Sequence, residues 1–158
     1  VDVGRYFLRF LEEESCGKCL PCRLGLTRLR EILDNFSKGK GTEQDIDDLN
    51  SLSQAIQDGA LCALGSSAPN PVLTTLRYFK DEYLAHVNDQ KCPAGVCKDL
   101  ITYTIDTGLC TGCRSCARQC PAGCISGDKK EPHVIDTEHC LRCGICMETC
   151  KFGAVLVD

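Results

Sequence analysis

The sequence predicts an α+β chain with a helical bundle over residues 1–90 and a second domain with short strands over residues 99–158. Three observations predict this division. Apolar residues recur at helical spacing before residue 90, short β-like runs alternate with Gly-rich turns after residue 98, and the second part repeats itself after thirty residues. We expect residues 86–98 to form a linker between the two domains.

The first two expected helices are read from apolar periodicity. The first ends in the acidic run 12–14, and the second covers residues 22–36, before Gly39 and Gly41. We interpret their apolar faces as core: Val3, Tyr6, Phe7, Phe10 and Leu11 in the first helix, and Leu24, Leu26, Leu29, Ile32, Leu33 and Phe36 in the second.

Two further helices are read from their starts. Thr42, with Asp45 three residues on, resembles an N-terminal capping pair, and Asn70 before Pro71 resembles another helix start. We assign their apolar faces to the same core: Ile46, Leu49, Leu52 and Ile56, then Leu73, Leu76, Phe79, Tyr83 and Val87. Four short amphipathic helices predict a small bundle.

The second part contains three β-like runs, at 101–105, 133–135 and 154–157. Ile105-Asp106 before Cys110 returns as Ile135-Asp136 before Cys140. A strand, a cysteine cluster and a short helix therefore occur twice, which predicts a pseudo-twofold module.

Composition narrows the function classes. The 158 residues include 15 cysteines, and the formal net charge is −4, which gives no support to nucleic-acid binding. No apolar run is long enough to span a membrane and no signal peptide is visible, so we expect a cytoplasmic protein. The odd cysteine count and the two-residue gaps favour metal sites over disulfides. Because the chain opens with Val1 in a helical pattern, we interpret it as a piece of a longer polypeptide.

The strongest motif is duplicated in the second part. Each copy has the spacing C-x2-C-x2-C-x3-C of two-cluster bacterial ferredoxins, in which the fourth cysteine of each run binds the other cluster. Zinc sites more often use paired C-x2-C units with a longer spacer. Lys151 stands where the second run commonly has Pro. We assign one [4Fe–4S] cluster to Cys110, Cys113, Cys116 and Cys150, and a second to Cys120, Cys140, Cys143 and Cys146.

The helical part has a motif of its own. Cys16, Cys19 and Cys22 have the two-residue gaps that suit three corners of a [4Fe–4S] cube, and Cys62 is the candidate for the fourth. A zinc site made of the same four residues is the alternative. The expected fold is thus a helical bundle carrying one [4Fe–4S] cluster, followed by a two-cluster bacterial ferredoxin-like domain.

Three cysteines remain after these twelve. Cys92 and Cys97 form a C-x4-C knuckle, His86 precedes it, and Cys124 lies in the second part. Three thiolates and one imidazole make a complete tetrahedral zinc site, so we hypothesise that His86, Cys92, Cys97 and Cys124 bind zinc. Two alternatives stay open: Cys124 as a buried thiol near the second cluster, and His133 in place of Cys124 or His86.

Several basic residues lie near the cluster motifs. They belong to a solvated surface of mixed charge, or they offset the negative charge of the clusters or dock a partner. They are Lys18, Arg23, Arg114, Arg118, Arg142 and Lys151.

The strings ESCGKCLPCRLG and CALGSSAPNPV resemble the C-terminal helical domain of the flavin-containing, NADH-oxidising subunit of complex I (the 51 kDa-like subunit) and of related soluble hydrogenases and formate dehydrogenases. With the ferredoxin part attached, the chain resembles that subunit in electron-bifurcating or NADP-reducing [FeFe]-hydrogenases and related formate dehydrogenases. In that family the helical cysteines hold a [4Fe–4S] cluster beside FMN.

The resemblance implies an electron-transfer segment with three [4Fe–4S] clusters and one zinc, which in related enzymes is thought to act as a hinge. FMN, NAD(P) and a [2Fe–2S] cluster are expected only in the preceding part of the longer subunit, because no Gly-rich phosphate loop occurs here. The implied partners are a hydrogenase or formate dehydrogenase catalytic subunit, a small [2Fe–2S] subunit and ferredoxin. A free-standing polyferredoxin-type carrier and a structural metal-bound interaction module remain the alternatives.

Overall fold

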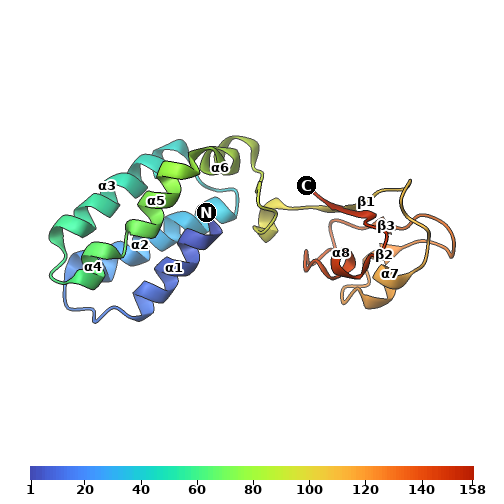
Figure 1. Cartoon of the computed structure of the whole chain (residues 1–158), viewed down its shortest axis with the longest axis horizontal. Helices are drawn as coiled ribbons and strands as arrows, with labels where there is room; N and C mark the ends of the chain where they lie inside the picture. The colour runs from blue at the N-terminus through green and yellow to red at the C-terminus, as the bar shows by residue number, and fades with distance from the viewer. The chain divides into compact units, whose positions relative to one another are not determined.

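The computed structural model describes all 158 residues, which form two compact units, Val1–Leu100 and Ile101–Asp158 (Figure 1). Residues 86–98, which we expected to link the two domains, belong to the first unit. None of the helices combines the length and apolar character that crossing a membrane requires.

The first unit is entirely helical (Figure 1). Three of its longer helices are the ones expected from the sequence. The expected helix from Asn70 to Val87 is instead interrupted at Phe79, whose backbone is not helical, and short helical segments follow it. The elements are α1 (Asp2–Glu13), α2 (Leu20–Ser37), α3 (Glu43–Gly59), α4 (Ala63–Ser67), α5 (Asn70–Tyr78), α6 (Lys80–Leu84), a π-helical segment η1 (Ala85–Asp89) and a 3-10 turn η2 (Lys98–Leu100).

The core of this unit is built around α2, which packs against α1 and α3. Phe36 of α2 and Tyr83 of α6 are fully buried and meet edge to face, with ring centroids 5.6 Å apart. Their neighbours in the core come from every longer helix and include Leu8, Leu26, Leu29, Leu33, Leu49, Ile56 and Val72.

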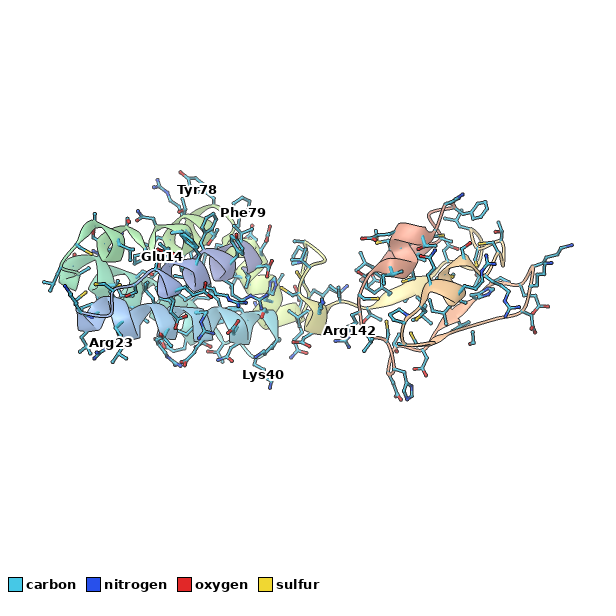
Figure 2. The ribbon with its side chains drawn as sticks, turned by 90° about the horizontal axis from the view of Figure 1, so that it is seen from below. Glu14, Arg23, Lys40, Tyr78, Phe79 and Arg142 are labelled. Atoms are coloured by element: carbon cyan, nitrogen blue, oxygen red, sulfur yellow. The ribbon has the colours of Figure 1, made fainter.

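The prediction of which face of α1 packs in the core is wrong. Val3, Tyr6, Phe7 and Phe10 are exposed, whereas Leu8 is fully buried. The reason is a close approach at Gly4, where an added Cβ would lie 3.4 Å from Leu33 and 3.7 Å from the Tyr83 hydroxyl. The Gly4–Leu8 side of α1 therefore faces the core, and the larger apolar side chains lie on the other sides. Leu24 of α2 is likewise exposed, and so is Phe79, which is labelled in Figure 2.

The helix starts agree with the sequence in one case and differ in two. Thr42 and Asp45 form the expected capping box of α3. Asn70 is the first residue of α5 rather than its cap, and its Oδ1 accepts a hydrogen bond from Gln57 at 2.8 Å. Helix α2 begins at Leu20, two residues earlier than expected, because Pro21 is well suited to its first turn.

The second unit consists of two interlocked repeats (Figure 1). Strand β1 (Tyr103–Ile105), helix α7 (Ser115–Gln119) and strand β2 (Ile125–Ser126) are followed by β3 (Val134–Ile135), α8 (Ile145–Thr149) and β4 (Val155–Val157). β1 pairs antiparallel with β4, and β2 with β3, so each two-stranded sheet takes one strand from each repeat. Strand β2 was not expected from the sequence.

Candidate iron–sulfur and metal sites

The first cavity of the second unit is lined almost entirely by apolar and sulfur atoms. Four of its lining residues are the cysteines assigned from spacing to one cluster, including the distant Cys150. The structure therefore brings together Cys110, Cys113, Cys116 and Cys150, with Ile105, His133, Phe152, Ala154 and Val155 among the residues around them.

The second cavity is the counterpart of the first and has a similar lining. It brings together Cys120, Cys140, Cys143 and Cys146, again the four residues assigned from spacing. Cys124 lines it as a fifth cysteine, with its Sγ 3.5 Å from that of Cys120.

The exchange of fourth cysteines follows from the short helices. Cys120 directly follows the last residue of α7, and Cys150 directly follows that of α8, each with extended backbone. Helices α7 and α8 pack against each other, and Thr149 donates a hydrogen bond to the Gln119 side chain at 2.9 Å. Each helix thus carries its last cysteine to the cavity of the other repeat.

Peptide N–H groups are directed at the sulfur atoms of both cavities. His133 N–H donates to Cys110 Sγ at 3.5 Å, Ala154 N–H to Cys150 Sγ at 3.4 Å, and Arg142 N–H to Cys140 Sγ at 3.4 Å. The N–H of Ser115 holds the pKa of the Cys113 thiol below its ordinary value. These contacts stabilise thiolates, which are the form that binds metal.

Burial acts in the opposite direction on the most enclosed cysteines. It raises the pKa of Cys116 and of Cys146, because a charged thiolate is poorly solvated there. A bound cation reverses this preference by pairing directly with the thiolate.

The candidate site of the first unit forms where α2 and α4 begin. Cys19 precedes the first turn of α2, and Cys62 precedes that of α4. The N–H of Leu61 is directed at Cys19 and lowers the pKa of its thiol. Cys22 is buried, with its Sγ 3.2 Å from Ser15 Oγ, and Cys16 and Cys62 are exposed.

Gly65 permits this approach of α4 to α2. An added Cβ would lie 2.7 Å from the Ala60 Cβ and 3.4 Å from the Cys22 Cβ. Because a Cβ at 2.7 Å requires displacement of its neighbour, a glycine keeps the 60–65 turn close to the cysteines of α2.

A third group is formed by His86, Cys92 and Cys97, all buried in the first unit, with their ligand atoms within 4.8 Å of one another. His86 Nδ1 donates to the Glu82 carbonyl at 2.6 Å, since a carbonyl only accepts. That bond leaves the lone pair of Nε2 available, and Nε2 lies 3.4 Å from Cys97 Sγ. A fixed histidine tautomer of this kind is characteristic of metal-binding histidines.

The turn between the two cysteines of this group supports the same chemistry. Although burial disfavours the thiolate of Cys92, the N–H groups of Cys97, Val96 and Ala94 outweigh burial and lower its pKa. Burial and the neighbouring Cys92 raise the pKa of Cys97 to about 12. The surroundings therefore favour the thiolate of Cys92, whereas Cys97 requires a cation to become one.

His133, the alternative zinc ligand from the sequence, lies in the second unit. Its ring is 1% exposed, its Nδ1 donates to the Glu131 carbonyl at 3.1 Å, and its Nε2 has no hydrogen-bond partner. It lines the first cavity beside Cys110.

The sequence repeat indicates which cavity Cys124 and His133 line, which their residue types alone do not indicate. Thirty residues separate Cys124 from Ala154 and Tyr103 from His133, and in each pair one member lines each cavity. An alignment of the two repeats would therefore have assigned Cys124 to the second cavity from the sequence alone.

Comparisons with known proteins agree with these sites. The family model described as "NADH-ubiquinone oxidoreductase-F iron-sulfur binding region" matches residues 2–86, and a 4Fe-4S dicluster domain model matches residues 109–154. The chain is 59% identical over 133 residues to the NADP-reducing hydrogenase subunit HndC of Solidesulfovibrio fructosivorans, which covers 84% of this chain and 27% of that protein.

Two further relatives extend the comparison. The F subunit of the NADH-quinone oxidoreductase of Mycobacterium bovis is 44% identical over 93 residues, or 59% of this chain and 21% of that protein. The crystal structure of an NAD+-reducing [NiFe]-hydrogenase in the H2-reduced state matches with a TM-score of 0.53 and 30% identity, covering 55% of this chain and 15% of that one.

The chain spans about a quarter of the length of the curated relatives it matches. The first family model covers more than half of the chain, and it includes all four cysteines of the helical site. The chain therefore belongs to the family of NADH-ubiquinone oxidoreductase-F iron–sulfur binding regions, continued by a 4Fe-4S dicluster domain.

Proposed function

We propose that the chain is the electron-transfer segment of a multi-subunit NAD(P)H-dependent oxidoreductase, a hydrogenase of the flavin-based electron-bifurcating kind. It would relay electrons through three [4Fe–4S] clusters between FMN and partner subunits or ferredoxin. The observation that carries the proposal is the pair of cavities, each of which gathers the four cysteines assigned to one cluster from both repeats.

These cavities have the chemistry that iron–sulfur clusters need. Their linings are sulfur and apolar carbon, the peptide N–H groups are directed at the sulfurs, and the cysteine spacing is that of two-cluster ferredoxins. We assign the first to Cys110, Cys113, Cys116 and Cys150, and the second to Cys120, Cys140, Cys143 and Cys146.

The helical site would hold the third [4Fe–4S] cluster, bound by Cys16, Cys19, Cys22 and Cys62. The family match over residues 2–86 supports iron–sulfur over zinc here. When bound, such clusters supply one-electron redox chemistry, with a potential set by net charge, hydrogen bonds to sulfur and solvent exposure.

Solvent exposure and hydrogen bonding to sulfur differ among the three sites. The helical site has two exposed cysteines, Cys16 and Cys62, whereas each site of the ferredoxin-like unit has one, Cys113 or Cys143. The directed N–H groups stabilise negative charge on the sulfurs, and the apolar linings exclude water.

We also propose that His86, Cys92 and Cys97 bind zinc. Their ligand atoms converge, and the histidine tautomer leaves Nε2 available. Cys124, the fourth ligand named from the sequence, lies beside Cys120, a contact that favours a place at the second cluster site. The zinc proposal therefore rests on the three residues of the first unit. A role as a hinge before the ferredoxin-like unit follows from their position in the chain, just ahead of Ile101.

Partners and remaining cofactors are proposed from the relatives. HndC is named as a subunit of an NADP-reducing hydrogenase, and the solved relative is an NAD+-reducing hydrogenase. We therefore propose a hydrogenase or formate dehydrogenase catalytic subunit, a small [2Fe–2S] subunit and ferredoxin as partners. FMN, NAD(P) and a [2Fe–2S] cluster would belong to the rest of a longer subunit.

The test is an anaerobic reductive titration of the chain followed by EPR. Three reducible clusters predict uptake of about three electrons per chain, with three distinguishable signals. Clusters that stay oxidised at every accessible potential would contradict the relay and favour a structural role. Signals from only two clusters would contradict the cluster assigned to the helical site, and with it the proposed link to the flavin.

A further inference from the structure

A basic recess lies on the second unit beside the first cavity. It is lined by three uncharged residues and four cations, with no carboxylate among them: Thr111, Gly112, Cys113, Arg114, Arg118, Lys129 and Lys130. All four cations are exposed, and none forms an ion pair. The chain as a whole carries a net charge of −4, so this recess is a local reversal of charge.

The cations come from two segments that are fixed against each other. The N–H of Lys130 donates to the Gly112 carbonyl at 3.1 Å, and the N–H of Glu131 closes a turn on Asp128 at 3.2 Å. A Cβ on Gly112 would lie 2.4 Å from the Glu131 nitrogen, so only glycine permits this packing. The β2–β3 connection is therefore held directly on the loop that carries Cys113.

The local backbone of the recess is unfavourable in two places. Arg114 and Lys130 have φ values of 64° and 71°, in the left-handed region where side chains other than those of Gly, Asn and Asp are uncommon. The equivalent of Arg114 in the second repeat is Gly144, at φ 82°. A residue held in a sparsely populated conformation is a reason to look for function.

The positive charges of the recess are a second unfavourable feature, in addition to its left-handed backbone. Arg114 is the N-cap of α7, where the helix dipole disfavours a cation, and Arg118 follows it at i,i+4. Lys129 and Lys130 place two more positive charges at the same recess. In the isolated chain these charges repel one another, and an acidic surface would relieve the repulsion.

The recess and the first cavity share three lining residues, one of which is Thr111. Cys113 and Arg114 belong to both, and Cys113 is exposed. We propose that the basic recess docks an acidic one-electron carrier protein, whose carboxylates pair with Arg114, Arg118, Lys129 and Lys130. This inference rests on the proposed function: one electron passes between the carrier's redox centre and the cluster bound by Cys113, one being oxidised as the other is reduced, and no bond or proton moves.

The test uses the full chain with its clusters and a probe of known charge, an acidic plant-type [2Fe–2S] ferredoxin in its oxidised form. The Kd is measured anaerobically over a range of salt concentrations. The variant is Lys129→Gln/Lys130→Gln, which leaves every cysteine in place. Its matched control is Lys40→Gln/Lys80→Gln, which removes two exposed, unpaired cations of the first unit (Lys40 is labelled in Figure 2).

We expect the recess variant to weaken binding about tenfold and to flatten its salt dependence, because two of four cations are lost. The control should bind like the parent chain. Equal binding by both variants, binding that salt does not weaken, or no binding of the ferredoxin would overturn the proposal. So would a variant that shifts the cluster potential and leaves the Kd unchanged, since the cations would then act on the cluster alone.

Reduction by methyl viologen radical separates this inference from the proposed function. The viologen radical is a small cation that needs no acidic docking face, so no variant should be reduced by it more slowly than the parent chain. If the viologen fails to reduce the parent chain, the relay fails, whatever the ferredoxin Kd shows. If it succeeds and the Kd does not respond to the recess variant, the docking surface alone fails.

Discussion

The Sγ atoms of Cys120 and Cys124 lie 3.5 Å apart at the second cavity of the ferredoxin-like unit. Burial and the neighbouring Cys120 sulfur raise the pKa of Cys124 to about 12, so Cys124 stays a thiol. Burial alone would raise the pKa of Cys120 too, but the Cys124 N–H and S–H groups together with nearby N–H groups lower it. The contact therefore stabilises negative charge on the Cys120 sulfur and keeps the proton on Cys124.

Replacing Cys124 tests which site it serves. In Cys124→Ala we expect the iron content and the zinc content to stay at parental values, and the second cluster to become harder to reduce. Hydrogen bonds to the ligand sulfurs favour the more negative, reduced state, and this variant removes one. Metal analysis and an EPR-monitored redox titration measure both quantities.

Two controls accompany this variant. Cys124→Ser keeps a donor and should retain more of the parental potential, and Cys97→Ala should lose the zinc while keeping the iron. Loss of zinc from Cys124→Ala would instead make Cys124 the fourth zinc ligand, as the sequence first indicated.

Cys62 tests the helical site. We expect Cys62→Ala to lower the iron content from about 12 to about 8 per chain, because a cluster with three ligands on an exposed surface is readily lost. The zinc content should not change. Ser67→Ala, on the same short helix α4, is the matched control and should keep all of its iron. An unchanged iron content in Cys62→Ala would show that the fourth ligand lies elsewhere.

Gly112 and Gly123 form a matched pair for backbone packing. Both have positive φ, at 65° and 62°, but an added Cβ meets Glu131 at 2.4 Å in one case and nothing within 4 Å in the other. Gly123→Ala should cost about 1–2 kcal/mol from the left-handed backbone alone. Gly112→Ala should cost more, because the β2–β3 connection must move.

Anaerobic thermal denaturation, followed by the loss of cluster absorbance, measures this difference. Equal midpoints for the two variants would mean that the connection is not held against the ligand loop, which would also weaken the case for a fixed basic recess.

Glu12 and Arg30 predict a pH dependence of the first unit. Arg30 Nε donates to Glu12 Oε2 at 2.6 Å, and Thr27 donates to the other carboxylate oxygen. Burial opposes the charge of Glu12, yet these bonds outweigh it and lower its pKa below 4.5. A carboxyl with a lowered folded-state pKa stabilises the fold above pH 4.5, and the contribution is lost as the pH falls through the folded-state value.

We therefore expect Glu12→Gln to reduce the free energy of unfolding by about 1 kcal/mol at pH 7 and by less as the pH approaches about 4. Circular dichroism of the helical signal during denaturation measures it. Glu13→Gln is the control, because its ion pair with Arg9 is exposed and should contribute little. A difference between the two variants that does not depend on pH would exclude this charge as the cause.

Periodicity and spacing predicted what depends on local sequence. The first three helices, the α3 capping box and the repeat appear in the structure, because each is encoded within a few turns or one motif. The expected fourth helix is interrupted at Phe79, which periodicity did not predict. The exposed face of α1 was not predictable in this way. Tyr6 and Phe7 have the periodicity of core residues, and only the position of the neighbouring helices decides that Leu8 is buried instead.

The same distinction holds at the sites. The gathering of Cys110 with Cys150 follows from a spacing rule, because the repeat fixes which helix crosses to which cavity. Counting unassigned cysteines could not find the place of Cys124; its correspondence with Ala154 in the other repeat carried that signal. The basic recess was only partly predictable from the sequence. Arg114 and Arg118 belong to the first cysteine motif, whereas Lys129 and Lys130 join them through the turn that packs on Gly112.

Iron and zinc per chain, measured on anaerobically purified protein, test the relay most directly. Three [4Fe–4S] clusters and one zinc site predict about 12 iron and about 1 zinc. About 12 iron without zinc would keep the relay and remove the site at His86, Cys92 and Cys97. About 8 iron with additional zinc would make Cys16, Cys19, Cys22 and Cys62 a zinc site, and would contradict an electron path that begins in the helical unit.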